Sequence, residues 1–126
     1  MKTILVDAWN TFVTKDGVFQ EMKTLLDSYQ NEKIILTNAN EEEKITYGIV
    51  NMPYKVFSLG HNPNKVDPGF YKKMLAEFSL TINDVVYFEH NAEAVESARS
   101  VGIETYHYDK DEKDLGKLKK FLDKNL

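Results

Sequence analysis

The amino-acid sequence predicts an α/β fold, in which a mainly parallel sheet is covered by helices on both faces. Short runs rich in β-branched residues are apolar throughout, as in strands that are buried on two sides. These runs alternate with segments in which apolar residues recur at helical spacing. A length of 126 residues is enough for one such domain with one core. We therefore expect residues 1–126 to form a single doubly wound, Rossmann-like domain.

Five segments are expected to be the strands of this sheet: 3–6, 33–36, 54–58, 84–88 and 104–108. Each is short and apolar on both of its faces. Their alternation with helical segments favours right-handed crossover connections between parallel neighbours.

Four longer helices are indicated by their apolar faces and by their end signals. The first carries Met22 and Leu26 on one face. The second begins at Asp67-Pro68, a capping residue followed by proline at the first helical position. Asn91 is expected to cap the third helix and Gly102 to end it. The last buries Leu115, Leu118, Phe121 and Leu122 and leaves lysines 117, 119, 120 and 124 outward, which is typical of a solvated face.

Composition excludes several classes of partner. The net charge is −4 and the pI about 5.4, which disfavours a nucleic-acid partner. The chain has no cysteine, so disulfides, thiolate metal sites and cysteine nucleophiles are excluded. Its apolar stretches are strand-sized, so we expect no membrane span, and Met1 runs directly into a strand without a signal peptide. A cytoplasmic location is expected.

Polar residues follow three of the predicted strands. Asp7 comes after the first strand, Thr37 and Asn38 after the second, and Glu89, His90 and Asn91 after the fourth. One polar residue in such a place is usually a turn or helix cap. Three clusters at one sheet edge instead indicate a site, because ligands of doubly wound sheets bind beyond the carboxyl ends of the strands.

These clusters resemble, in order, the four motifs of the haloacid dehalogenase (HAD) superfamily. Ile4–Thr11 is similar to the first motif, in which an apolar strand leads into Asp-x-Asp-x-Thr. Ile34–Asn38 resembles the second motif, which ends in Thr or Ser. Lys65–Pro68 resembles the third, and Val85–His90 occupies the place of the acidic fourth motif. The resemblance spans nearly the whole chain and implies a HAD-like core domain.

The resemblance implies a hydrolase, in the simplest case a Mg²⁺-dependent phosphatase with Asp7 as the nucleophile. Thr37 would then hold an oxygen of the transferring group, and Lys65 would offset the charge of Asp7 and of the substrate. Asp7 and Glu89 would share the Mg²⁺ ion. The remaining residues implied to lie against substrate are Thr11, Asn38 and Asn91.

The spacing of the motifs leaves no room for the cap domain that many HAD proteins insert. Only one crossover fits between Asp7 and Thr37, and another between Thr37 and Lys65. Residues 11–19, with the turn-forming pair Asp16-Gly17, would match the family's mobile flap. Capless relatives act on large substrates or use a neighbouring subunit as a lid. The substrate is therefore expected to be a small-molecule or macromolecular phosphate. The sequence leaves open whether the chain forms a homo-oligomer.

Two departures from the motifs keep alternatives open. Trp9 stands where phosphatases of the family have a second aspartate that protonates the leaving group, and tryptophan cannot transfer a proton. Glu89-His90 replaces the usual pair of aspartates, which weakens a Mg²⁺ site; His90 could be a ligand or a base, or have no function. The alternatives are a HAD-fold binding or interaction module without catalysis and, from the Ala8-Trp9 pair and Asn91, a dehalogenase-type hydrolase.

Overall fold

In a computed structural model that describes residues 1–126, the chain has one five-stranded sheet with the strand order β5-β4-β1-β6-β7, and all neighbouring strands are parallel. The strands are β1 (Thr3–Asp7), β4 (Lys33–Thr37), β5 (Lys55–Ser58), β6 (Val85–Glu89) and β7 (Glu104–His107). The predicted doubly wound α/β fold is confirmed. Strand order reverses at β1, so the chain's crossovers leave the centre of the sheet in both directions.

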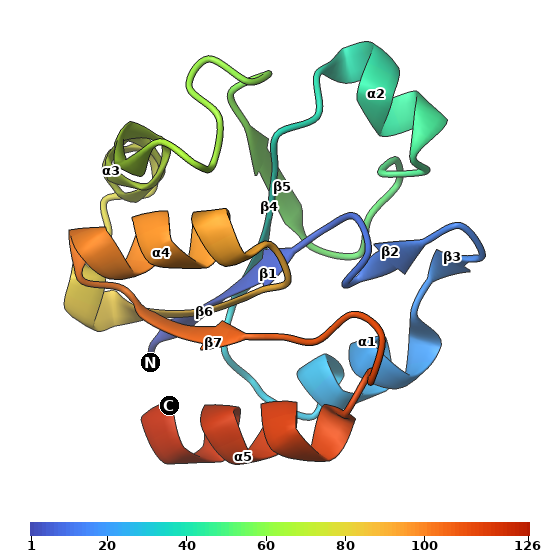
Figure 1. The fold of residues 1–126 in the computed structure, drawn as a ribbon. Helices are drawn as coiled ribbons and strands as arrows, with labels where there is room; N and C mark the ends of the chain where they lie inside the picture. Colours follow the sequence, from blue (N-terminus) through green and yellow to red (C-terminus); the bar gives the residue numbers. More distant parts are fainter.

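Helices cover both faces of this sheet (Figure 1). On one face lie α1 (Gln20–Asp27) and α5 (Leu115–Asn125), which bury Met22, Leu26, Leu118 and Leu122. On the other face lie α3 (Pro68–Glu77) and α4 (Ala92–Val101). Side chains alternate along β1, so that Ile4 and Val6 join the first cluster of buried side chains and Leu5 joins the second. The sheet therefore separates two apolar layers, as the apolar strands require.

The helix ends form as their residues predict. The Asp67 side chain accepts the Gly69 N–H at 2.8 Å, with Pro68 at the first helical position of α3. Asn91 caps α4 by accepting the Ala94 N–H at 3.1 Å, and Gly102 ends this helix with a φ of +105°. These caps fix where α3 and α4 begin, next to the carboxyl ends of the strands.

Two small elements lie at that same end of the sheet (Figure 1). The hairpin of β2 (Val13–Thr14) and β3 (Gly17–Val18) occupies the segment expected to be a flap. Helix α2 (Glu41–Thr46) follows β4, starts with a capping box between Asn40 and Glu43, and buries none of its residues. No further domain is inserted between β1 and β4 or between β4 and α3.

Strands β1 and β6 each run one residue beyond their predicted ends. Asp7 pairs with Leu36, and Glu89 pairs with His107, so both carboxylates stand on strand residues rather than on loops. The sheet's hydrogen bonds therefore hold these two acidic residues rigidly at its edge.

No helix of the chain is both long enough and apolar enough to span a bilayer. A short 3₁₀ turn, Ile82–Asp84, leads into β6.

Candidate active site

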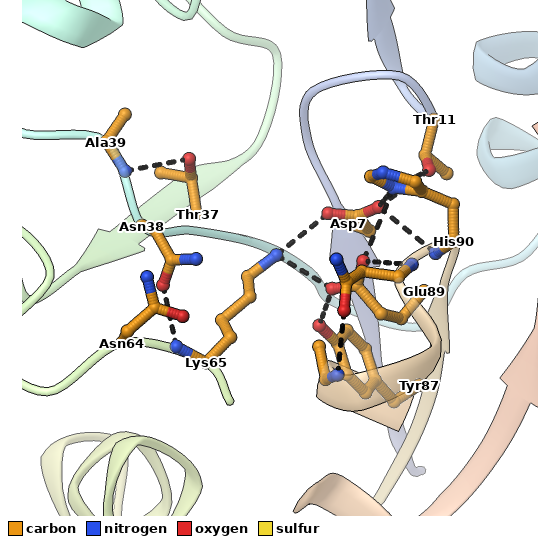
Figure 2. Close-up of polar contacts among 12 residues, drawn as sticks. Asp7, Thr11, Thr37, Asn38, Ala39, Asn64, Lys65, Tyr87, Glu89 and His90 are labelled. Carbon is orange, nitrogen blue, oxygen red and sulfur yellow. Dashed lines mark hydrogen bonds and ion pairs between the residues drawn. The ribbon is translucent and has the colours of Figure 1, made fainter. Parts of the chain in front are cut away.

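The residues that end three adjacent strands meet at one edge of the sheet. Asp7 is the last residue of β1, Thr37 of β4 and Glu89 of β6. Because β1 lies between β4 and β6, these side chains are neighbours across the strands. Lys65 reaches the same place from the loop that precedes α3, as Figure 2 shows. The structure thus brings together four residues that are far apart in sequence.

The Asp7 carboxylate is the centre of the arrangement and is 2% exposed. Lys65 Nζ donates to its Oδ1 at 2.8 Å. Its Oδ2 accepts the Thr11 hydroxyl at 2.7 Å and lies 2.5 Å from His90 Nδ1. The His90 backbone N–H adds a longer contact of 3.3 Å to Oδ2. Asp7 is therefore held in one orientation by donors on both of its oxygens.

Lys65 bridges two carboxylates. Its Nζ is 2.8 Å from Asp7 Oδ1 and 2.9 Å from Glu89 Oε1, and the residue is 4% exposed. Its backbone N–H donates to the Asn38 side-chain oxygen at 2.7 Å. Asn38 therefore positions Lys65 by holding the loop from which the lysine extends (Figure 2).

Glu89 is buried behind Asp7, where Tyr87 OH donates to its Oε1 at 2.5 Å and the Asn91 N–H to its Oε2 at 3.0 Å. Burial and the neighbouring Asp7 charge raise the pKa of Glu89 to about 7, although Lys65 acts against them. Between about pH 4.5 and pH 7, Glu89 is therefore largely protonated, whereas an isolated glutamate is ionised.

Asp7 responds in the opposite direction. Burial raises the pKa of Asp7, but Lys65 and the hydrogen bond from His90 lower it by more, so this pKa lies well below its usual range. Burial lowers the pKa of Lys65, but attraction to Asp7 and Glu89 outweighs it and leaves the pKa raised. The pKa of His90 is also raised: burial opposes this, and the hydrogen bond and charge of Asp7 prevail. Asp7 is thus an ionised carboxylate beside the Lys65 ammonium and an imidazole whose protonated form Asp7 favours.

The other residues expected at the site have different surroundings. The Thr37 hydroxyl accepts the Ala39 N–H at 3.2 Å, donates to no protein atom, and faces the cavity described below. Thr11 is 1% exposed and lies behind Asp7 rather than on the cavity. Asn91 lies at the cavity, with its side-chain oxygen used by the cap of α4.

A cavity of about 310 Å³ opens beside these groups. Its walls come from the loop after β1, from β4 and α2, from the loop before α3, and from the end of β6. The lining includes Asp7, Thr37, Asn38, Lys65, Glu89, His90, Asn91, Trp9, Tyr47, Glu43 and His61. A broader depression of about 420 Å³ lies over the exposed acidic loop after β7 and shares only His90 with this cavity. The Asp7 carboxylate faces the smaller one, which is therefore the candidate active site.

Two contacts at the site are absent from the sequence prediction. Tyr87 stands two residues before Glu89 on the same strand, so strand alternation could have placed both side chains on one face. The pairing of the Trp9 ring with the Tyr47 ring, with centroids 4.7 Å apart, joins residues from separate segments and has no local sequence signal. The structure also puts His90 directly on Asp7, which the sequence left undecided.

Asp7, Glu89 and His90 offer three potential metal-binding atoms within 4.8 Å of one another. As arranged, hydrogen-bond donors compete with Mg²⁺ for these atoms. Lys65, Thr11, His90, Tyr87 and the Asn91 N–H together give every oxygen of the two carboxylates at least one hydrogen-bond donor. The third potential ligand is an imidazole nitrogen, whereas Mg²⁺ prefers a nearly octahedral set of oxygens. Lys65 already supplies a positive charge that offsets the two carboxylates.

No protein-family model matches the chain, and neither does any curated protein sequence. Solved structures do. An uncharacterized protein from Corynebacterium glutamicum is similar over 98% of this chain and 96% of its own, with a TM-score of 0.63 and 16% identity. A HAD family enzyme from Bacteroides thetaiotaomicron, solved as an aspartate-to-alanine mutant with magnesium and inorganic phosphate, is similar over 94% and 98%, with a TM-score of 0.70 and 11% identity.

A putative beta-phosphoglucomutase from Thermotoga maritima shares 23% identity with a TM-score of 0.54. The match covers 70% of this chain but only 44% of that protein, so the likeness is to part of a longer chain. The strand order, the placement of the four motif residues and these neighbours agree. The chain has the fold of the haloacid dehalogenase-like proteins.

Proposed function

We propose that the protein hydrolyses phosphate monoesters, with Asp7 as the nucleophile. The observation that carries this proposal is the Asp7 carboxylate itself, which is buried, ionised and fixed by Lys65 at 2.8 Å while it faces a cavity. A catalytic carboxylate needs this combination, because it must be unprotonated and already oriented when the substrate binds. The HAD-like fold of the Bacteroides neighbour, a complex with magnesium and inorganic phosphate, supports a phosphate ligand.

In the first step, Asp7 Oδ1 forms a bond to phosphorus while the bond from phosphorus to the leaving oxygen breaks and its electron pair leaves with that oxygen. The Lys65 ammonium, beside Oδ1, lies where it offsets negative charge on the transferring group. The free O–H of Thr37 donates to one of that group's oxygens. In the second step, the oxygen of a water molecule forms a bond to phosphorus while the bond from phosphorus to Asp7 Oδ1 breaks and its electron pair returns to the carboxylate. Inorganic phosphate leaves with the protons of that water, and Asp7 is restored.

The sequence predicts Mg²⁺ between Asp7 and Glu89, and the Bacteroides complex is in favour of such an ion. The donors around the two carboxylates of this chain favour a different solution, in which Lys65 and His90 provide the positive charge. Our proposal accordingly has no step that depends on a metal.

A phosphate-binding module without turnover is the second candidate, and Trp9 is the observation that favours it. Trp9 lines the cavity where a proton donor for the leaving group would serve, and its indole cannot take that role. Such a module would bind phosphate through Lys65 and Thr37 and would not form a covalent intermediate.

Trapping the intermediate tests the proposal. The protein is mixed with radiolabelled acetyl phosphate or an aryl phosphate, with Mg²⁺ or with a chelator, and quenched in acid. We expect phosphate release and a labelled peptide that contains Asp7. The Asp7→Asn variant should give neither, whereas the control Asp16→Asn, at an exposed turn, should behave like the natural sequence. Phosphate binding without release or labelling would favour the binding module instead.

A further inference from the structure

Two aromatic side chains form one wall of the cavity that contains Asp7. Trp9, in the loop after β1, and Tyr47, directly after α2, both line it. Their ring centroids are 4.7 Å apart, with 42° between the ring planes. Trp9 is half-buried, and Tyr47 is 36% exposed. A ligand in the cavity therefore meets aromatic surface and the nucleophile together.

The fold does not need Tyr47 for its core. Helix α2 contributes no buried residue, and polar contacts hold it at the sheet edge: the capping box at Asn40 and a 2.7 Å pair between Glu43 and His61. His61 in turn lies 3.1 Å from the Asn64 side chain, next to Lys65. These contacts tie α2 to the loop that carries the catalytic lysine, and so they set Tyr47 over the cavity.

The chemistry of the site independently restricts the leaving group. In-line transfer places the leaving oxygen opposite Asp7. Lys65 and His90 form hydrogen bonds to Asp7 on the attacking side, and Trp9 cannot donate a proton to the leaving oxygen. Because Trp9 stands where a proton donor would serve, the site favours a leaving group that departs as an anion. A phenolic oxygen ionises near pH 10, whereas an aliphatic hydroxyl is roughly as weak an acid as water, at about 15.7.

We propose that the substrates are phosphate monoesters of planar, conjugated alcohols such as phenols, whose ring stacks against the wall formed by Trp9 and Tyr47. This inference rests on the proposed function. Its two supports are separate: the aromatic wall acts on binding, and the missing proton donor acts on the rate. Both favour the same class of leaving group.

A matched pair of ligands tests it. Phenyl phosphate and cyclohexyl phosphate have similar size and the same phosphate, and only the first has an aromatic face. Calorimetric titrations use the Asp7→Asn variant, which prevents turnover. Trp9 is the only tryptophan of the chain, so its fluorescence reports ring contact at the same time. We expect phenyl phosphate to bind about threefold to tenfold more tightly, which is the range typical of aromatic pairs, and to change the Trp9 emission.

Variants locate the effect. Tyr47→Ala should remove most of the preference for phenyl phosphate, Tyr47→Phe should keep it, and Ile45→Ala, at a 72% exposed residue of α2 outside the cavity, should leave it unchanged. Equal affinity for the two esters, or a preference for phenyl phosphate that survives Tyr47→Ala, would overturn the inference. In that case the binding of both esters would still be consistent with the proposed function. If neither ester nor inorganic phosphate binds, the proposed function fails first.

Discussion

The buried carboxyl of Glu89 should make the stability of the protein depend on pH in a way that one substitution removes. In the folded chain Glu89 keeps its proton up to about pH 7, whereas its ordinary value is 4.5. Between these two values the folded state binds more protons than the unfolded state. Glu89 therefore lowers the free energy of unfolding as the pH rises from about 4.5, and its full cost is present above pH 7.

The size of the effect follows from the same two values. At about 1.4 kcal/mol for each decade of proton concentration, the interval from 4.5 to about 7 corresponds to about 3 kcal/mol. Of this, about 2 kcal/mol or more falls between roughly pH 5 and pH 8. Glu89→Gln keeps the shape of the side chain and an acceptor for Tyr87 OH and Lys65, but it cannot titrate.

Urea unfolding at the two pH values measures the difference. Relative to the natural sequence, Glu89→Gln should gain about 2 kcal/mol between roughly pH 5 and pH 8. The substitution also puts an amide N–H₂ opposite the Asn91 N–H, which costs stability equally at both pH values. The control Glu104→Gln changes an exposed residue of β7, where solvent screens the charge. If the free energy of unfolding changed equally between the two pH values in Glu89→Gln and in the natural sequence, the raised pKa of Glu89 would be refuted.

Three further predictions follow from the same cluster. Lys65→Met leaves Asp7 and Glu89 buried without their shared cation, so it should lower the free energy of unfolding by about 3–5 kcal/mol near pH 8 and by less near pH 5, where protonation relieves the repulsion. Urea unfolding beside the exposed control Lys117→Met measures this, and an equal loss at both pH values would contradict it. Asn38→Ala removes the acceptor of the Lys65 backbone N–H, so it should lower the free energy of unfolding by about 1–3 kcal/mol if that N–H stays buried. Because Asn38 positions Lys65, the substitution should also lower kcat more than it raises KM, and an unchanged kcat would argue against this role. Adding millimolar Mg²⁺ in place of a chelator should change neither Tm nor the rate of phosphate release, because hydrogen-bond donors already contact the two carboxylates. A rise in Tm that Asp7→Asn abolishes would show that the ion does bind there.

Much of the fold is readable from local patterns. Apolar runs of strand length and helical stripes with recognisable caps, such as Asp67-Pro68 and Asn91 with Gly102, define the alternation of strands and helices. The rule that parallel strands end at a common edge then predicts that Asp7, Thr37 and Glu89 are neighbours. Lys65 is less accessible to such reasoning, because it lies on a loop, and its place rests on resemblance to a motif.

The sequence by itself determined the residue types available at the sheet edge: carboxylates, a lysine, a hydroxyl, and a tryptophan where a proton donor would otherwise stand. Only the tertiary structure decided the protonation behaviour of those residues. Asp7 and Glu89 have the same functional group, yet one carboxyl is pushed strongly towards ionisation and the other towards protonation. At Asp7, Lys65 and the hydrogen bond from His90 outweigh the effect of burial on the pKa, whereas at Glu89 burial and the charge of Asp7 outweigh Lys65. Such effects depend on distances of a few ångströms between side chains from different strands and loops, and no local pattern in a sequence encodes them.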